Sequence, residues 1–172
     1  MDTRPTGPTF DASWNKETIK AAFDECVAQQ ALYAEWTDAI DKKTITIFTL
    51  ATAIAGATIN LLPKWGTLSA RTSQGIALAG VAWLTAAAAS WLAYRPRDIM
   101  VDPSPTVLSD PRWLGKPIEK YMFFRIRDMG SSFEHNRDEI NRKGHWLSVA
   151  TIGTIAEVVF LSLALFAKLS GA

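Results

Sequence analysis

Three long apolar runs divide the chain, and each has the length of a membrane-crossing helix. The runs are 44–62, 75–94 and 147–168. A helix that crosses the ~30 Å hydrocarbon core of a bilayer needs about 20 mainly apolar residues. The runs do not alternate between apolar and polar residues with a period of two, which disfavours a membrane barrel. We therefore predict three transmembrane helices. The alternative is that the runs are buried helices of a soluble domain. Buried helices of soluble proteins seldom stay free of charged residues over such a length.

Two polar stretches, 13–43 and 117–143, have the periodicity of amphipathic helices, in which one face recurs every three or four residues. Ser13 or Asn15 can cap the first helix. Its stripe is Ile19, Phe23, Cys26, Gln30, Tyr33, Thr37 and Ile40. The stripe of the second helix is Ile118, Met122, Arg125 or Ile126, Met129, Phe133, Asn136 and Ile140.

Both amphipathic helices are expected to continue into an apolar run. Neither Gly nor Pro occurs between residues 13 and 55, and the second helix leads through Gly144 into the third run, with 130–132 (Gly-Ser-Ser) as a site where it could kink. The predicted fold is an all-α integral membrane protein. It has three transmembrane helices and a cytoplasmic helical bundle formed by extensions of the first and last spans.

The remaining segments are expected to be irregular. Residues 1–12, rich in Pro, Thr and Gly, are predicted to form a disordered arm, and 63–74 an outer loop between the first two spans. Segment 95–146 is assigned to the cytoplasm, and its prolines before residue 117 prevent a long helix there. The N-terminus contains no apolar stretch typical of a signal peptide, so insertion is expected to depend on the first span.

Basic residues give the spans a direction. Five Lys or Arg residues precede the first span, two lie in 63–74, ten in 95–146 and one, Lys168, at the end of the third run. Because positive residues stay on the cytoplasmic side, the N-terminus is predicted to be cytoplasmic and the C-terminus outside. A multi-pass protein of a bacterial inner membrane fits this distribution.

The sequence contains no motif that indicates an enzyme. The phosphate-binding patterns GxxxxGK[ST] and GxGxxG and the catalytic patterns GxSxG and HExxH are all absent. Cys26 is the single cysteine, which excludes an intrachain disulfide, and His135 and His145 lack partners for a metal site. We expect no catalytic residue, no metal and no cofactor.

Arginine and phenylalanine residues on the second amphipathic helix have the chemistry of a nucleotide site. Arg125, Arg127 and Arg137 could bind phosphate, and Phe133 could stack on a base. The alternative is that these arginines form surface ion pairs with the acidic residues between them. Binding to nucleic acid is not expected, because the polar segments are not strongly basic.

Glu157 is the acidic residue in the middle of the third apolar run. An acid at membrane depth is costly in free energy and usually faces protein or water. Its expected neighbours at similar depth on the other spans are Thr49, Thr52, Thr85 and the indole of Trp83. There it could form a structural hydrogen bond between helices or act as a functional group.

The layout resembles a known family of membrane proteins. A polar helix that ends in Asp-Lys-Lys-Thr (41–44) enters the first span, and a helix with Asn-Arg-Asp-Glu-Ile-Asn-Arg-Lys (136–143) enters the last. This arrangement resembles the membrane effectors of the bacterial Pycsar antiphage system and, more loosely, the SLATT defence-associated membrane proteins. The matching positions are Asp41, Lys42, Asn136 and Lys143. The chain departs from better-understood effectors in having no separate sensor domain.

The resemblance implies an antiphage effector that impairs the membrane and causes abortive infection. The trigger would be cyclic UMP or cyclic CMP made by a partner cyclase, and the chain would act in the bilayer as a homo-oligomer. Two other functions remain open: a structural or accessory subunit of a larger membrane complex, and a small proton-linked channel that uses Glu157.

Overall fold

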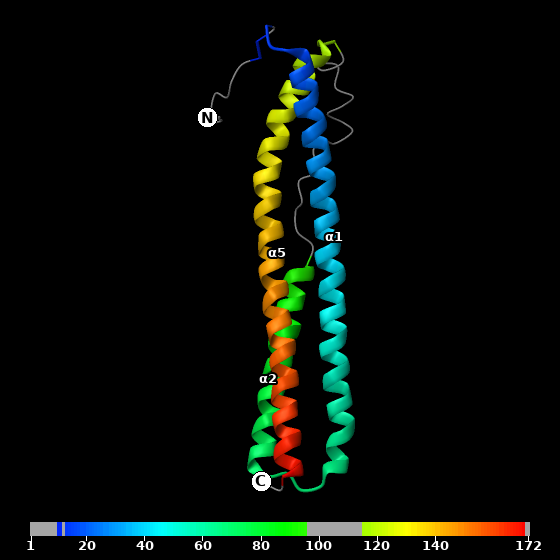
Figure 1. The fold of residues 1–172 in the computed structure, drawn as a ribbon, viewed down its shortest axis with the longest axis vertical. Helices are drawn as coiled ribbons and strands as arrows, with labels where there is room; N and C mark the ends of the chain where they lie inside the picture. The colour runs from blue at the N-terminus through cyan, green and yellow to red at the C-terminus, as the bar shows by residue number, and fades with distance from the viewer. Residues whose placement is uncertain (1–9, 12, 96–114, 171–172) are drawn as a thin grey trace. The chain divides into compact units, whose positions relative to one another are not determined.

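The computed structural model describes residues 10–11, 13–95 and 115–170, and the regular elements in these ranges are all helical (Figure 1). They are α1 (Lys16–Leu61), the short 3-10 helix η1 (Leu62–Trp65), α2 (Ala70–Tyr94) and α5 (Ile118–Leu169). The most apolar windows of α1, α2 and α5 have mean hydropathies of 1.8, 1.7 and 2.1. Each of these three helices is long and apolar enough to cross a membrane. The predicted all-α fold with three long apolar helices is confirmed.

The chain divides into two compact units, and α1 and α5 each contribute residues to both. Unit 1 comprises Met1–Glu35 and Asp98–Asp138, and unit 2 comprises Trp36–Arg97 and Glu139–Ala172. Both helices are continuous through the unit boundary, α1 over 46 residues and α5 over 52. The expectation that the two amphipathic helices run on into apolar segments is therefore confirmed. Helical structure also continues through Gly130 and Gly144.

Asn15, rather than Ser13, caps α1. The side-chain oxygen of Asn15 accepts hydrogen bonds from the backbone N–H groups of Glu17 at 2.8 Å and Thr18 at 3.2 Å. These bonds satisfy donors that have no partner within the first turn of a helix. Ser13 instead donates its backbone N–H to the Asp11 carboxylate at 2.8 Å, which lowers the pKa of Asp11.

The amphipathic stripe predicted for α1 is its least exposed face in unit 1. Ile19 is buried, and Phe23, Cys26, Gln30 and Tyr33 are half-buried between exposed neighbours. The rings of Tyr33 and Phe133 pack with their centres 5.6 Å apart. These contacts pack α1 against α5 through the faces that the 3/4 spacing indicated.

The stripe predicted for α5 needs two corrections. Ile118 is 62% exposed, because it is the first residue of the helix and lies beyond the packed face. Ser132 is buried although it was absent from the predicted stripe. A serine gives little hydropathic signal, so its place on the packed face was not visible in the sequence.

The second apolar helix begins earlier than the apolar run. We predicted residues 63–74 as a loop, but η1 covers Leu62–Trp65 and α2 starts at Ala70. The Ser69 side chain accepts a hydrogen bond from the backbone N–H of Thr72 and so caps α2. Gly66, at φ 64°, has a left-handed backbone conformation in the turn between η1 and α2. Residues with a Cβ adopt this conformation only at a cost in free energy. The first turn of α2 is polar, so hydropathy alone placed its start too late.

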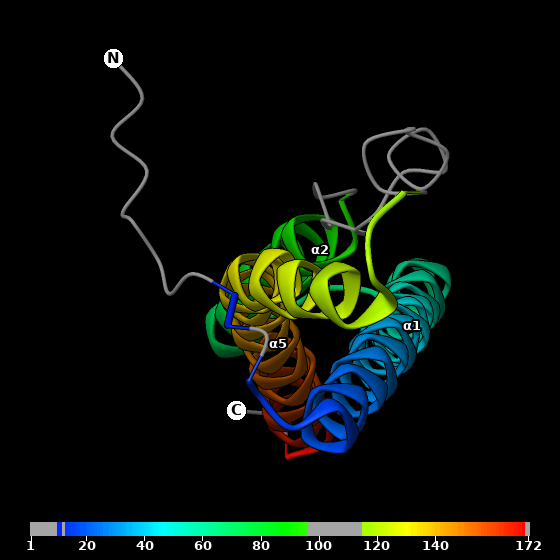
Figure 2. The ribbon, with the colours of Figure 1, turned by 90° about the horizontal axis from the view of Figure 1, so that it is seen from above.

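In unit 2, α2 lies beside α5, and small residues line their contact (Figure 2). A Cβ added to Gly153 would lie 3.0 Å from the backbone nitrogen of Ala86, and one added to Gly75 would lie 2.8 Å from Cβ of Ala164. Buried alanines recur every three or four residues along the facing side of α2: Ala79, Ala82, Ala86, Ala89 and Ala93. Small residues let helix backbones approach closely, which is a common basis of helix association in membranes.

The opposite faces of unit 2 expose large apolar side chains. Ile59, Trp91, Ile152 and Phe166 are between 65% and 71% exposed, and other large apolar residues of the three apolar segments are exposed as well. Soluble monomers rarely present contiguous apolar patches of this extent. Such faces fit contact with lipid, which agrees with a multi-pass membrane protein.

Candidate functional site

The packed face of α5 carries a long series of buried polar side chains, which we call the polar stripe. Its members are 2% to 4% exposed in most cases, and Glu157 is 1% exposed: Arg125, Ser132, Asn136, Lys143, Thr154 and Glu157. Met129, Ala150 and Ala164 share this face, so its buried positions recur at intervals of three, four or seven residues. Burying polar groups is unfavourable unless they find partners. The stripe is therefore where function is most readily sought.

A charged contact on the stripe joins α5 to α1 within unit 2. The Lys143 ammonium group donates a hydrogen bond to the Asp41 carboxylate at 2.6 Å. The Lys143 side chain is 5% exposed and that of Asp41 is 29% exposed. Hydrogen bonds in which both partners are charged are short and strong. The ion pair thus holds the two helices together where their apolar segments begin.

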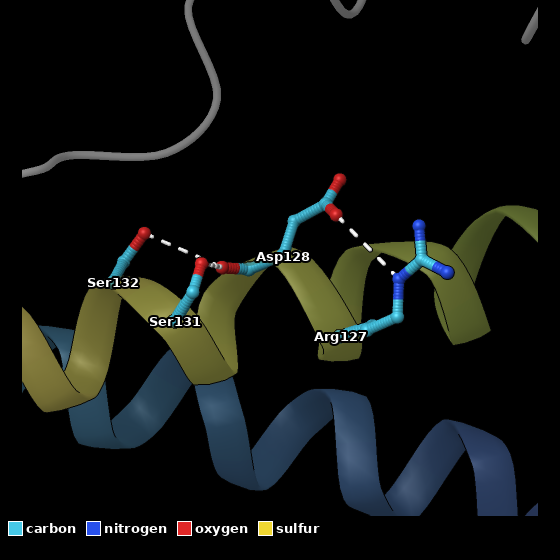
Figure 3. Close-up of polar contacts among 4 residues, drawn as sticks. All are labelled: Arg127, Asp128, Ser131 and Ser132. Carbon is cyan, nitrogen blue, oxygen red and sulfur yellow. Dashed lines mark hydrogen bonds and ion pairs between the residues drawn. The ribbon is translucent and has the colours of Figure 1, made fainter. Parts of the chain in front are cut away.

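Hydroxyl groups on α5 are satisfied by their own helix. Thr154 donates to the Ala150 carbonyl at 3.0 Å. Ser131 and Ser132 both donate to the Asp128 carbonyl, at 2.8 and 3.4 Å (Figure 3). In bonds of this type the hydroxyl donates to the carbonyl three or four residues earlier, and they commonly bend a helix slightly. The serines of 130–132 are accordingly held within the helix.

Glu157 lines a small apolar cavity between the three helices of unit 2. The cavity has a volume of about 150 Å³, and Thr58, Gly80, Trp83 and Leu161 are among its lining residues. Two buried polar atoms at this site, Oε2 of Glu157 and Nε1 of Trp83, have no hydrogen-bond partner in the described structure. The carboxyl group and the indole N–H can both be satisfied by a small polar molecule, such as water, that enters the cavity.

The structure does not bring Thr52 and Thr85 to Glu157. Both threonines are exposed, and the Thr85 hydroxyl donates to the Val81 carbonyl of its own helix at 2.9 Å. Of the neighbours expected for Glu157, Trp83 shares its cavity, whereas Thr52 and Thr85 lie on exposed faces. The positions of these residues along the spans predicted their depth but not the direction in which each side chain points. The rotation of each helix about its axis decides which side chains face inward.

The four residues proposed for nucleotide binding lie on different faces of α5. Arg125 is 3% exposed on the polar stripe, and Phe133 packs on Tyr33. Arg127 and Arg137 are exposed, and Arg127 pairs with Asp128 at 4.0 Å (Figure 3). These side chains do not converge on one pocket in the described structure.

An aromatic cluster in unit 1 offers a different combination of rings and cations. The ring of Phe123 packs against three other rings. Its centre lies 5.8 Å from that of Phe10, 5.0 Å from that of Trp14 and 5.6 Å from that of Phe124. The Arg127 guanidinium lies 5.2 Å, and the Lys116 ammonium 6.0 Å, from the centre of the Phe124 ring. Both distances permit cation–π attraction.

The Asp41–Lys143 pair was not predicted as a site, although its signal was present in the sequence. Asp41 follows Ile40 at the end of the α1 stripe, and Lys143 continues the Asn136 and Ile140 spacing of α5. Opposite charges at equivalent ends of two facing stripes indicate a pairing.

No protein-family model, curated protein or solved structure matches this chain.

Proposed function

We propose that this chain is a membrane-impairing effector of antiphage defence that acts in a bacterial inner membrane, with a cytoplasmic N-terminus, and assembles as a homo-oligomer. Three apolar helices supply the membrane segments, and the resemblance of the junctions at 41–44 and 136–143 supplies the biological context. A cyclic nucleotide made by a partner cyclase triggers the effector and causes abortive infection.

The observation that carries the proposal is the polar stripe within the apolar part of α5. Lys143, Thr154 and Glu157 all lie on the buried face of α5 in unit 2. Polar groups at membrane depth usually face protein or water, because exposing a charged side chain to lipid costs several kcal/mol. Within one copy this face packs against α1 and α2, so it lines a shared aqueous path only when assembly of the oligomer separates α5 from these helices. The bilayer would then leak ions, which is the damage an effector must cause.

The trigger is proposed to act through the aromatic cluster of unit 1. Phe123 and Phe124 offer ring faces to a pyrimidine base, and Arg127 offers a cation to a phosphate. A ligand shifts assembly only by its difference in affinity for the two states. Titration calorimetry with cyclic UMP and cyclic CMP should therefore give a binding signal that Arg127→Gln weakens. Absence of heat with both nucleotides would contradict direct sensing by this chain.

Membrane damage is tested by expressing the chain in cells with and without the partner cyclase while membrane potential is followed with a dye. Depolarisation should require both genes. Glu157→Leu should reduce it, because the substitution removes the deepest polar group of the stripe, whereas Glu157→Gln keeps the hydrogen-bonding capacity and should retain much of it. Ile155→Leu is the matched control, since Ile155 is an exposed neighbour on α5.

Three results would redirect the proposal. Full depolarisation by Glu157→Leu, at equal membrane content, would show that the polar stripe does not serve leakage. No depolarisation by the wild-type chain with the cyclase would favour a structural or accessory subunit. Equal loss in Glu157→Gln and Glu157→Leu would favour the proton-linked channel, in which the ionisable group itself is needed.

A further inference from the structure

A second cavity of unit 2 is an open groove between α1 and α2, distinct from the cavity at Glu157. Its volume is about 430 Å³, and it is lined by Thr44, Ile45, Phe48, Ala87, Ser90, Trp91 and Tyr94. Thr44 and Ser90 are buried at 1% and 3% exposure, whereas Phe48, Trp91 and Tyr94 are between 43% and 68% exposed. The groove therefore has a small polar floor and aromatic walls.

Ser90 distinguishes this groove from the other polar positions in the apolar helices. Thr44, Thr58, Thr85 and Thr154 each donate to the carbonyl four residues earlier in their own helix. The Ser90 hydroxyl is buried and has no hydrogen-bond partner in the described structure. A buried hydroxyl without a partner is costly by about 1–3 kcal/mol. An occupant that accepts a hydrogen bond would remove this cost.

A cation follows one end of the groove. Arg95 comes directly after Tyr94 at the end of α2. Lys42 and Lys43 line a separate groove between α1 and α5, together with Leu147 and Thr151. Trp and Tyr at the same end are typical of the membrane interface. The groove thus runs from an interfacial, positively charged end into an apolar interior.

We infer that this groove binds one anionic phospholipid. An acyl chain lies between Phe48, Ala87 and Trp91, and the Ser90 hydroxyl donates to an ester carbonyl. Arg95 attracts the phosphate. Five residues separate Ser90 from Arg95, a rise of about 7.5 Å along a helix. This distance is compatible with a phosphate and the ester carbonyls beneath it. The site goes beyond the proposed function, because it concerns neither the trigger nor the polar stripe.

The test uses the full-length protein in a zwitterionic detergent. Phosphatidylglycerol is added and compared with phosphatidylcholine of the same acyl chains and with glycerol 3-phosphate. Native mass spectrometry should find one phosphatidylglycerol retained per chain. The same lipid should raise the thermal unfolding midpoint more than phosphatidylcholine does. Glycerol 3-phosphate alone should have no effect, because the acyl chain supplies the apolar contacts.

Variants locate the site. Ala87→Phe fills the groove and should abolish the difference between the two lipids, whereas Ala88→Phe, at an exposed neighbour, should retain it. Arg95→Gln should weaken phosphatidylglycerol binding about fivefold. Lys43→Gln is the matched control, since Lys43 lines the separate groove between α1 and α5. Ser90→Ala is a milder variant that preserves the groove and should lower retention of both lipids.

Equal stabilisation by the two lipids would overturn the proposal, because the effect would then be general solvation of apolar helices. Retention of the lipid preference in Ala87→Phe would overturn it as well, because the anionic lipid would bind elsewhere. Helical circular dichroism of each variant checks folding before binding is measured. None of these results depends on leakage or on a nucleotide, so they are separate from the tests of the effector function.

Discussion

Lys143 on α5 donates a 2.6 Å hydrogen bond to Asp41 on α1, and its side chain is almost completely buried in doing so. The two residues are 102 positions apart in the chain. Each stands a few residues before an apolar segment, so one ion pair fixes the first and last apolar helices of unit 2 at the same level.

Removing one member of this pair should weaken unit 2. Lys143→Ala is expected to destabilise the protein by about 1.5–3 kcal/mol, because the Asp41 carboxylate loses a charged partner in a half-buried place. Exchange of the two charges in a double variant should recover part of the loss. The measurement is denaturant unfolding in detergent, arranged as a double-mutant cycle.

Lys42→Ala is the internal control for that experiment. Lys42 pairs with Asp38 at the same distance, 2.6 Å, but both side chains are largely exposed. Exposed pairs typically contribute about 0–1 kcal/mol. If Lys42→Ala destabilised the protein as much as Lys143→Ala does, burial would not be the reason for the strength of the Asp41–Lys143 pair.

Adding a methyl group at the α2–α5 contact should separate the helices. Gly153→Ala is expected to cost about 1–3 kcal/mol, since its Cβ would lie 3.0 Å from the Ala86 backbone nitrogen. Gly80→Ala has open space around it and should be neutral or slightly stabilising. Thermal unfolding followed by circular dichroism compares the two. Equal midpoints would contradict the close approach of α2 and α5.

Cys26 should react slowly with alkylating reagents. Burial on the α1 stripe, and to a lesser extent the charge of Glu25, raises the pKa of its thiol. Less thiolate is then present at a given pH, and the thiolate is the nucleophile. The rate of iodoacetamide labelling should rise with pH and remain several-fold below that of a Cys26→Ala, Ala28→Cys variant, because position 28 is exposed. Equal rates would place Cys26 on an exposed face.

The ion pair between Lys16 and Glu119, at 2.8 Å, should give unit 1 a dependence on acid. The hydrogen bond from Lys16 holds the pKa of Glu119 below its usual range. A depressed pKa means that the folded state favours the carboxylate. The contribution to stability is therefore present above the ordinary pKa of glutamate and is lost as pH falls through the lowered value.

Carbon-detected NMR of labelled glutamates can follow this titration. Lys16→Gln should return the pKa of Glu119 toward its ordinary value, whereas Lys20→Gln should leave it where it is. The stability difference between wild type and Lys16→Gln should shrink on acidification. An unchanged Glu119 titration in Lys16→Gln would show that its own backbone N–H, not the lysine, lowers the pKa.

The candidate site was only partly predictable. Glu157 stands out in the sequence because charge is costly among apolar residues, and the structure buries it. Of its expected neighbours, Trp83 lines the same cavity, whereas Thr52 and Thr85 lie on exposed faces. Similar reasoning grouped Arg125 with Arg127, although two steps along a helix turn a side chain by about 200°.

The sequence by itself determined the helices. Three features were sufficient to predict three long helices, two of them extended by polar segments: apolar runs of membrane length, the 3/4 spacing from Ile19 to Ile40, and the absence of Gly and Pro between residues 13 and 55. These properties are local, because hydropathy and periodicity act within a few turns of one helix. Only the tertiary structure decided which polar groups meet. The Asp41–Lys143 pair, the shared cavity of Glu157 and Trp83 and the unpartnered Ser90 hydroxyl all depend on how the helices are rotated against one another. That rotation is set by close contacts of small side chains such as Gly153 and Ala86, which carry little signal in the sequence.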